Sequence, residues 1–397
     1  MSRRPSAPWL DTLHVAALPF PSPQGTQAAL HHMLDALAGS KRQAELLTYA
    51  HGAKGPKCAF VVHRVADFPR LRSLRSGPSL RKLALDLRLA AALRVLLRGQ
   101  RPKVVVAHHV EAAAAALLAR ARPFVFVAHT DLELELPSYL PAALSSTSRL
   151  LGCHTDRVLM RSAAVVAAIS PLLAGQLGER HGVDAMLLPL PWSVGAAASD
   201  QHRREARRAL RCGLDDAVLL YAGNLDRYQG WELLIDSLST IVRSRPKTLL
   251  VVATESDPGR LRREAVKAGL GARLRVASLA GEAARRAVHS AADLALVPRG
   301  VPGGLPVKLL DSLARALPTV SVHRAAAGLP LSEIVWVSPD DDARALAATV
   351  VQALSSPVRC REMAARGQDY IRRQHSPQRF VAAMDAVIAR ACARSRA

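Results

Sequence analysis

The 397-residue sequence is poor in aromatic residues, in acidic residues and in long apolar runs. Aromatic side chains make up 4% of the chain, so few residues could stack on nucleic-acid bases. No stretch of about 18 uncharged apolar residues is present, which argues against a transmembrane helix. The five cysteines are scattered and form no Cys-x-x-Cys pair, so the sequence predicts neither a disulfide framework nor a zinc site. A reducing cytoplasm fits this cysteine usage.

The N-terminal residues do not have the pattern of a signal peptide. Arg3 and Arg4 supply positive charge, but the apolar run that follows is broken by Pro19, Pro21 and Pro23. A signal peptide needs an uninterrupted apolar segment after its basic residues. We therefore expect a cytoplasmic protein.

Basic residues exceed acidic ones, and the formal net charge is +22. The excess is strongest between Arg64 and Lys103, where eleven Lys or Arg residues face only Asp67 and Asp86. Such charge attracts polyanions over a long range. Two interpretations remain open: a solvated arginine-rich surface, or docking to the anionic inner face of the cell membrane. Nucleic acid is disfavoured because no recognised binding motif accompanies the charge.

Short continuous apolar segments alternate with helical patterns along the whole chain, and 50% of the residues are hydrophobic. This alternation predicts parallel sheets that are covered by helices on both faces. The expected strands cover residues 13–20, 44–50, 58–65, 103–109, 124–129, 164–169, 185–190, 218–223, 248–253, 274–279, 293–298, 319–322 and 334–337.

Residues 189–199 interrupt the alternation with Pro, Trp, Gly, Ala and Ser, and we place a domain boundary there. The prediction is an α/β protein with two doubly wound domains that face a cleft, covering residues 1–195 and 196–375. A basic amphipathic helix within residues 376–397 is expected to pack back on the first domain. Ligands of such sheets bind outside the carboxyl ends of the strands.

The stretch 301–318 has the strongest pattern for ligand binding. The pair Gly303-Gly304 precedes Pro306, a residue suited to the first position of a helix. Helical spacing places Lys308, Asp311, Ser312 and Arg315 on one face, which we expect to stay open. A free helix N-terminus with an early lysine predicts an anion site. The alternative is an ordinary amphipathic helix with a glycine-rich entry.

Three further candidates lie at predicted strand ends. Gly25-Thr26 precedes a helix and allows close backbone approach to a ligand, although a plain turn has the same pattern. His129 ends an apolar strand, and His108 and His109 end the preceding one, which favours a shared site over an isolated structural histidine. The third candidate is the turn Tyr221-Ala-Gly-Asn-Leu-Asp-Arg-Tyr-Gln-Gly-Trp231, with its two glycines.

Two of these motifs resemble glycosyltransferase family 4, also described as glycosyl transferases group 1. They are Tyr221-Ala-Gly-Asn with the following Gln-Gly-Trp-Glu-Leu-Leu-Ile-Asp-Ser, and Gly304-Leu-Pro-Val-Lys-Leu-Leu-Asp-Ser-Leu-Ala-Arg-Ala-Leu-Pro-Thr-Val. The resemblance implies the GT-B fold, which has two Rossmann-like domains. It also implies retaining transfer from a nucleotide-diphosphate sugar, with no metal ion in the chemistry and no cofactor.

The resemblance also implies roles for individual residues. The glycine loop at Gly25 and Thr26 would face the donor phosphates, and His129 would lie near the transferred sugar. Lys308, as the catalytic cation, and the N–H groups near Gly304 and Leu305 would hold the diphosphate. Asp311 would accept hydrogen bonds from the ribose, and the backbone of 278–281 would meet the base. The implied donor-binding set is Gly25, Thr26, Gly223, Asn224, Arg227, Gly304, Leu305 and Asp311.

The chain departs from the family pattern at three positions. The family often has an arginine and a lysine that clamp the diphosphate, where this chain has Asn224 and Gln229. The first of two glutamates eight positions apart is replaced by Gly303. We expect Arg227, Arg299 and Lys308 to compensate in part, because arginine binds phosphate through two parallel hydrogen bonds.

The predicted function is therefore sugar transfer to a glycan or lipid-linked acceptor, in the synthesis of a cell-surface polysaccharide or glycolipid. The alternatives are a GT-B-like scaffold that binds without turnover and another GT-B enzyme, such as a nucleotide-sugar epimerase. A dinucleotide-dependent dehydrogenase is disfavoured because no Gly-x-Gly-x-x-Gly follows the first strand. The donor base and sugar, the linkage and the oligomeric state are left open.

Overall fold

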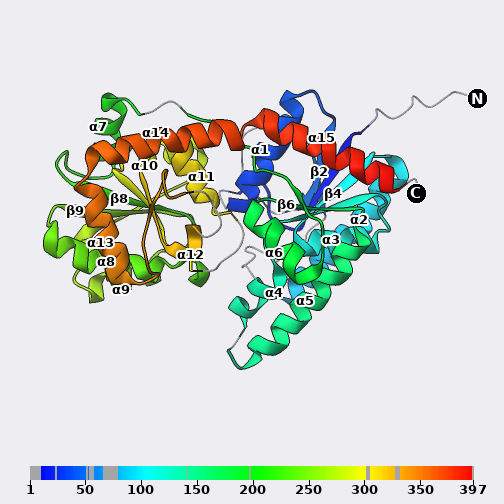
Figure 1. Cartoon of the computed structure of the whole chain (residues 1–397), viewed down its shortest axis with the longest axis horizontal. Helices are drawn as coiled ribbons and strands as arrows, with labels where there is room; N and C mark the ends of the chain where they lie inside the picture. Colours follow the sequence, from blue (N-terminus) through cyan, green and yellow to red (C-terminus); the bar gives the residue numbers. More distant parts are fainter. Residues whose placement is uncertain are drawn as a thin grey trace, which may run out of the picture. The chain divides into compact units, whose positions relative to one another are not determined.

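The computed structural model describes residues 10–22, 25–50, 52, 58–65, 79–140, 142–195, 198–300, 305–326 and 331–395. Internal contacts divide the chain into two compact units. The first comprises Met1–Ser22, Thr26–Pro191 and Pro377–Ala397, and the second comprises Pro23–Gly25 and Trp192–Ser376. Each unit is an α/β layer structure built on its own sheet (Figure 1).

The described part of the first unit contains a seven-stranded parallel sheet with the order β3-β2-β1-β4-β5-β6-β7. Strand β1 pairs with β2 and β4, so that His14 lies opposite Leu46 and Val106. The strands are β1 (Thr12–Ala16), β2 (Ala44–Tyr49), β3 (Val61–Val65), β4 (Val104–His108), β5 (Phe124–Ala128), β6 (Val165–Ala168) and β7 (Met186–Leu187).

The helices of this unit include the C-terminal helix α15, which contacts β4, β5 and β6. Arg42, which follows α1, donates to Asp385 of α15 at 2.6 Å. Arg390 of α15 donates to Asp184, which precedes β7, at 2.6 Å. The helices are α1 (Gly25–Gly39), α2 (Leu80–Gly99), α3 (His109–Leu118), α4 (Leu132–Glu135), α5 (Ser145–Ser162), α6 (Pro171–His181) and α15 (Pro377–Arg394), with 3-10 turns η1 (Leu136–Tyr139) and η2 (Ala142–Leu144).

The described part of the second unit contains a six-stranded parallel sheet with the order β10-β9-β8-β11-β12-β13. Its strands are β8 (Ala217–Ala222), β9 (Thr248–Ala253), β10 (Leu274–Ala277), β11 (Leu294–Val297), β12 (Thr319–Ser321) and β13 (Trp336–Val337). Its helices are α7 (Asp200–Ala209), α8 (Trp231–Ser244), α9 (Gly259–Lys267), α10 (Gly281–Ala291), α11 (Val307–Ala314), α12 (His323–Ala326), α13 (Ala343–Leu354) and α14 (Pro357–Gln374), with η3 (Arg227–Gln229) and η4 (Gly271–Arg273).

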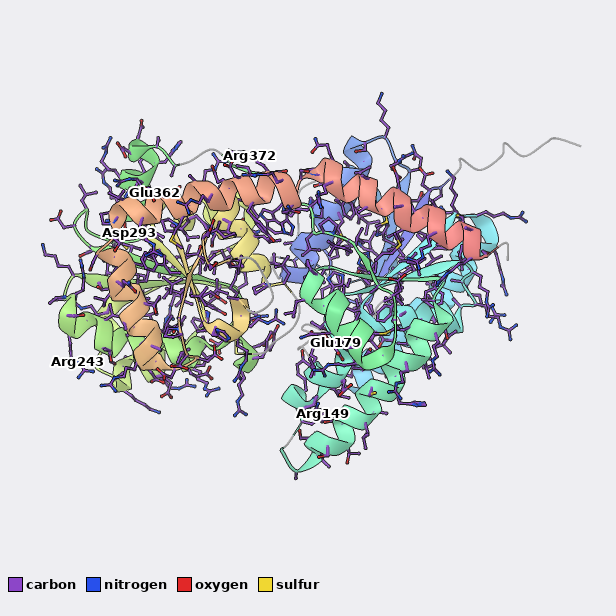
Figure 2. The ribbon with its side chains drawn as sticks, in the orientation of Figure 1. Arg149, Glu179, Arg243, Asp293, Glu362 and Arg372 are labelled. Carbon is purple, nitrogen blue, oxygen red and sulfur yellow. The ribbon has the colours of Figure 1, made fainter. Side chains whose placement is uncertain are left out.

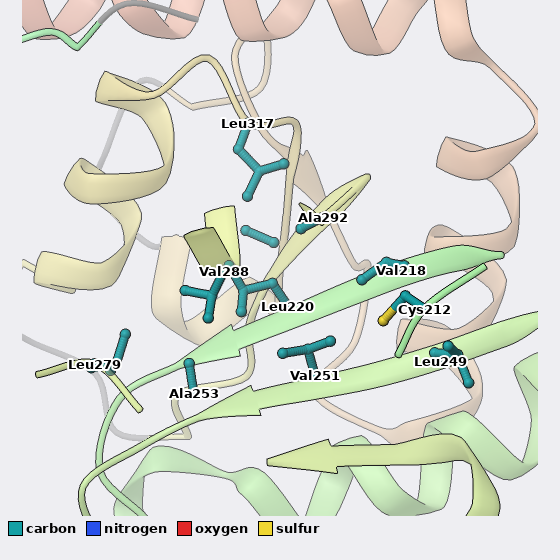
Figure 3. Packing of buried hydrophobic residues seen from close by; sticks show 11 residues of the cluster. Cys212, Val218, Leu220, Leu249, Val251, Ala253, Leu279, Val288, Ala292 and Leu317 are labelled. Carbon is teal, nitrogen blue, oxygen red and sulfur yellow. The ribbon is translucent and has the colours of Figure 1, made fainter. Parts of the chain in front are cut away.

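The core of the second unit forms on the faces of its central strands. Alternate residues of β8 and β9 point to one face, where Val218 and Leu220 meet Leu249 and Val251 (Figure 3). Val288 of α10 covers this face, and the side chain is 2% exposed. The predicted pair of doubly wound parallel sheets is thus confirmed.

The basic helix α7 is anchored by one buried arginine. Arg207 is 1% exposed and donates to the backbone carbonyls of residues 213, 214, 216 and 291, and to the carboxylate of Asp293 at 2.7 Å. Asp293, labelled in Figure 2, also accepts from Arg203 and from the N–H of Val218. The positive charge of α7 is therefore partly used inside the unit, where Arg207 holds the helix against its neighbours, and is not confined to the solvated surface.

Within the described ranges, no helix combines the length and the apolar character needed to cross a bilayer.

Candidate functional site

In the second unit, the candidate anion site lies where β8 and β11 end. Gly223 directly follows β8, and its N–H donates to the carbonyl of Ala253 at 3.0 Å. Its φ of +155° is a value that favours glycine. A Cβ atom here would lie 3.2 Å from Nζ of Lys308. Glycine therefore lets the ammonium group of Lys308 approach the backbone at the strand end.

Lys308 is the second residue of α11, and its side chain is held on two sides. Nζ donates to Oε1 of Gln229 at 2.6 Å and lies 4.2 Å from the centre of the Tyr221 ring, a cation–π distance. Burial lowers the pKa of Lys308 to about 7, and the positive charge of Arg299 contributes to the shift. An anion placed beside this ammonium group would stabilise its charged form.

The two neutral residues at the family's clamp positions belong to the same cluster. Gln229 supplies the oxygen that orients Lys308. The backbone carbonyl of Asn224 accepts the hydroxyl proton of Tyr221. In the described part of the chain, Oδ1 of Asn224 is buried and has no hydrogen-bond partner. These residues therefore organise the site but do not add charge to it.

The two arginines expected to compensate occupy different surroundings. Arg299 is the cation whose charge reaches Lys308, and its guanidinium lies 6.0 Å from the centre of the Tyr228 ring. Arg227 is exposed in η3 and faces a cavity of 560 Å³. The cavity is lined by Arg227, Gly230, Glu232, Leu233, Arg260, Pro298, Gly300, Val322 and Asp341.

The carboxylate of Asp311 lies among basic side chains of α10 and α11. It accepts from Nε of Arg315 at 3.1 Å and lies 3.5 Å from Nε2 of His289 and 4.0 Å from Arg285. Burial acts to raise the pKa of Asp311, but His289, Arg315 and Arg285 outweigh it and the pKa is lowered. Arg315 continues the network to Glu282 at 2.9 Å.

The prediction that the polar face of α11 stays open is wrong for the middle turn of the helix. Asp311 is 8% exposed and Ser312 is 3% exposed. Asp311 lies against His289 and Arg285 of α10. The periodicity of one helix cannot show that a second helix covers it. Leu305, just before α11, is buried, whereas Gly303 and Gly304 fall outside the described residues.

The first unit contains a hydrogen-bonded chain of histidines in and beside its central strands. Nε2 of His129 lies 3.1 Å from Nδ1 of His108, and Nε2 of His108 lies 2.9 Å from Nδ1 of His14. The chain ends at the hydroxyl of Thr12, 3.1 Å from Nε2 of His14. The ring of His109 stacks on His129, with centres 4.2 Å apart. The predicted grouping of residues 108, 109 and 129 is thus observed, and His14 is an addition.

Burial keeps these rings neutral. It lowers the pKa of His14 to about 3, and it lowers the pKa values of His108 and His129 well below the ordinary value. A neutral imidazole has one donor and one acceptor nitrogen. The proton positions along the chain are therefore coupled, and they set whether Nδ1 of His129 donates or accepts.

Gly25 and Thr26 form the first turn of α1. Gly25 is exposed and Thr26 is partly buried. The 15-residue helix thus begins two residues earlier than predicted, because Gly25 and Thr26 belong to its first turn and not to the preceding loop. The free N–H groups lie in this turn. Its N-terminus therefore has the geometry for an anion, as expected from the glycine at that position.

Two family models match the chain. The glycosyl transferase 4-like domain matches residues 24–191, and the domain named glycosyl transferases group 1 matches residues 216–356. No curated protein matched the sequence.

Several solved structures share the fold over nearly the whole chain. Sucrose-phosphate synthase from Thermosynechococcus elongatus has a TM-score of 0.81 at 15% identity, covering 97% of this chain and 99% of that one. HepE from Anabaena, in complex with UDP-glucose, has a TM-score of 0.75 at 16% identity, with coverages of 95% and 99%. WaaG, a glycosyltransferase involved in lipopolysaccharide biosynthesis, has a TM-score of 0.70 at 16% identity, also with 95% and 99%. With its two Rossmann-like units and both family matches, the chain belongs to glycosyltransferase family 4, the group 1 glycosyl transferases of GT-B fold.

Proposed function

We propose that this protein is a retaining hexosyltransferase that moves a sugar from a nucleotide-diphosphate sugar to a glycan or lipid-linked acceptor. The observation that carries the proposal is the position of Lys308 against Gly223 and Gln229, at the ends of β8 and β11. HepE, a structural neighbour, was solved with UDP-glucose, which supports the donor class.

In this proposal the diphosphate takes the place beside Lys308. Its negative charge would be stabilised by the ammonium group, by Arg299 and by the N–H groups at the start of α11. These donors are already in position, so they would stabilise the charge that develops on the leaving nucleotide diphosphate. We infer that protein cations alone perform this task and that the chemistry needs no metal ion.

We propose further contacts with the donor, of which the last, from the first unit, rests on the family resemblance alone. Asn224 has a buried oxygen available for a hydroxyl donor, and Gly223 allows the backbone to approach the ligand. The side chain of Asp311 is 11% exposed, and we propose that this edge accepts from the ribose. His129 would contact the transferred sugar, with its tautomer selected by His108.

A front-face displacement requires no nucleophile from the protein. The donor carbon–oxygen bond breaks as the acceptor hydroxyl attacks from the same side, and the proton of that hydroxyl passes to the departing phosphate oxygen. Configuration at the sugar carbon is therefore retained. The role left to the protein is to bind, orient and stabilise charge.

We further propose that α2 docks this enzyme on an anionic membrane surface. Leu83, Leu87 and Val95 are 56%, 54% and 64% exposed, and their spacing puts them on one side of the helix. The same side carries exposed Arg81, Arg88, Arg94 and Arg98. The one acidic residue of the helix, Asp86, is partly buried and accepts a hydrogen bond from buried Tyr49. Apolar side chains mixed with arginine are typical of helices that lie in a membrane interface. The acceptor would then be lipid-linked, in cell-surface polysaccharide or glycolipid synthesis.

The test is incubation with a panel of nucleotide sugars and lipid extract, following release of the nucleotide diphosphate and the configuration of the product. We expect release with one donor and a product of retained configuration. Tight donor binding with no release of nucleotide diphosphate, and with no slow hydrolysis of the donor, would instead support the scaffold alternative. The neutral residues at 224 and 229 favour that alternative. An epimerised nucleotide sugar formed without acceptor would support the epimerase.

Membrane docking is tested separately by flotation with vesicles of neutral lipid and vesicles containing anionic lipid. We expect flotation only with the anionic vesicles, and its loss on Leu87→Glu together with Val95→Glu. Equal flotation with both vesicle types would contradict the docking proposal and leave the transfer chemistry unaffected.

A further inference from the structure

Three side chains from separate helices meet inside the first unit. Asp131 caps the N-terminus of α4, Asp156 lies in α5, and His181 is the last residue of α6. One donor atom from each lies within 4.8 Å of the other two. The side chains of Asp131 and His181 are 0% exposed, and Asp156 is also 0% exposed. Two carboxylates and an imidazole are thus buried together.

The inward-facing polar atoms of this cluster have no hydrogen-bond partners in the described part of the chain. They are Oδ2 of Asp131, Oδ1 of Asp156 and both ring nitrogens of His181. The other carboxylate oxygens are used, because both aspartates accept from the N–H of Glu133, at 3.0 and 3.3 Å. Buried polar groups nearly always find partners, so four unpartnered atoms at one point need an explanation.

The backbone is built for close approach at this point. Gly152 lies one turn before Asp156 in α5, and a Cβ atom there would lie 2.8 Å from Cα of Glu133. Glycine therefore lets α5 pack directly against the start of α4, which brings the two aspartates together. The C-terminal end of α6 adds the negative end of a helix dipole beside His181.

The nearby positive charge is not placed to satisfy these atoms. Nε of Arg180 lies 3.9 Å from Oδ2 of Asp131, and its NH1 lies 3.7 Å from Glu133, both beyond hydrogen-bond distance. Nε2 of His181 is 3.8 Å from Oδ2 of Asp131, again too far for a hydrogen bond. A metal with bonds of about 2.0–2.2 Å holds its ligand atoms roughly 3.0–3.6 Å apart, and the 3.8 Å between Nε2 of His181 and Oδ2 of Asp131 is slightly longer.

We propose that Asp131, Asp156 and His181 bind a divalent transition-metal ion, with zinc as the first choice. Imidazole nitrogen with carboxylate oxygen suits zinc, whereas magnesium and calcium prefer oxygen ligands alone. A fourth ligand is at hand, because Glu133 and Cys153 form a second set with His181 within 4.8 Å. The ion would tie α4, α5 and α6 together. It is independent of the proposed transfer chemistry, which uses no metal.

A shared proton is the competing explanation. Burial and the charge of Asp131 raise the pKa of Asp156 to about 8, so a proton on Asp156 would relieve the repulsion between the carboxylates. That proton leaves both nitrogens of His181 without partners, whereas a metal ion gives one of them a ligand bond. The two explanations predict different effects of the same substitution.

The experiment uses the full-length protein, stripped of metal with a chelator and titrated with zinc chloride against a chromophoric zinc indicator. We expect one equivalent bound, and a melting temperature that rises by roughly 5–10 °C at free zinc about 100-fold above Kd. Asp156→Asn keeps the shape of a protonated aspartate and should fold. This variant and His181→Gln should each weaken zinc binding by at least about tenfold, since even second-shell changes cost that much.

Matched controls are Glu179→Gln on α6, an exposed residue labelled in Figure 2, and His154→Gln on the exposed side of α5. Both should bind zinc as the unmodified protein does. Zinc bound equally by all four variants would place the ion at other histidines or cysteines and overturn the proposal. The proposal would also be overturned if the unmodified protein bound no stoichiometric zinc and Asp156→Asn were more stable than the unmodified protein. The shared proton would then account for the cluster.

Discussion

The pKa of Lys308 leads to a specific pH dependence of donor binding. A nucleotide-diphosphate sugar has no phosphate group that titrates near neutrality, so a change in affinity there reports the protein. In the protein without donor, Lys308 has a pKa of about 7 because its ammonium group is buried near Arg299. Only the charged form pairs strongly with phosphate, so about one molecule in eleven is competent at pH 8. We expect Kd to be nearly constant below about pH 6.5 and to rise roughly tenfold per unit above pH 7.

Two variants isolate the lysine in this experiment. Lys308→Arg keeps its charge at every pH used, so its Kd should not depend on pH over this range. Lys308→Met removes a charge-assisted hydrogen bond worth about 1.5–3 kcal/mol, which corresponds to roughly 10- to 150-fold weaker binding at pH 6.5. The assay is isothermal titration calorimetry with the donor found in the panel.

Stability gives an independent measurement of the same pKa. The unfolded lysine titrates near 10.4 and the folded one near 7, so between these values the unfolded chain binds more protons. Stability from this group therefore rises with pH between about 7 and 10, and below pH 7 the charged lysine costs on the order of a few kcal/mol. Without donor, Lys308→Met should melt at a higher temperature than the unmodified protein at pH 6.5. A lower melting temperature, with donor affinity unchanged, would refute the phosphate assignment.

Other substitutions test the supporting structure. Gly223→Ala should cost about 1–3 kcal/mol of stability and weaken donor binding, because it strains the backbone and crowds Lys308; chemical denaturation and calorimetry measure the two effects. His14→Leu leaves Nε2 of buried His108 without a partner and should cost about 1–3 kcal/mol in urea denaturation. Arg207→Met should cost about 3–5 kcal/mol, because it leaves Asp293 and several carbonyls short of a donor; the more exposed Arg203→Met should cost under about 1 kcal/mol.

The alternation of apolar strands and helices was sufficient to predict both sheets, and the helix predicted within residues 376–397 is α15. These features depend on local periodicity, which a single segment carries in full. The position of Lys308 in the first turn of a helix was also predictable, because Pro306 and the lysine are neighbours in the chain.

Features that depend on distant segments could not be predicted in this way. His14 lies within an apolar strand, and its partner His108 is 94 positions away, so only the strand order β1-β4-β5 brings these rings together. The burial of Asp311 involves His289 and Arg285 of α10, a separate helix that ends at Ala291. The proposed metal ligands are spread over residues 131–181, with none of the short spacings that identify zinc sites in sequences.

The two neutral residues at the clamp positions, Asn224 and Gln229, change how the proposed donor site would hold a phosphate. With Gln229 in place of a lysine, the carboxamide oxygen accepts from Lys308, and no second ammonium group stands beside it. A second cation at this distance would lower the pKa of Lys308 further, and a carboxylate would raise it but repel the phosphates. A neutral acceptor avoids both effects: it orients the ammonium group and leaves its charge for the ligand. The proposed site therefore depends on one titrating lysine with Arg299 near it, and its affinity for donor should depend on pH more steeply than that of a protein with an arginine and a lysine at positions 224 and 229.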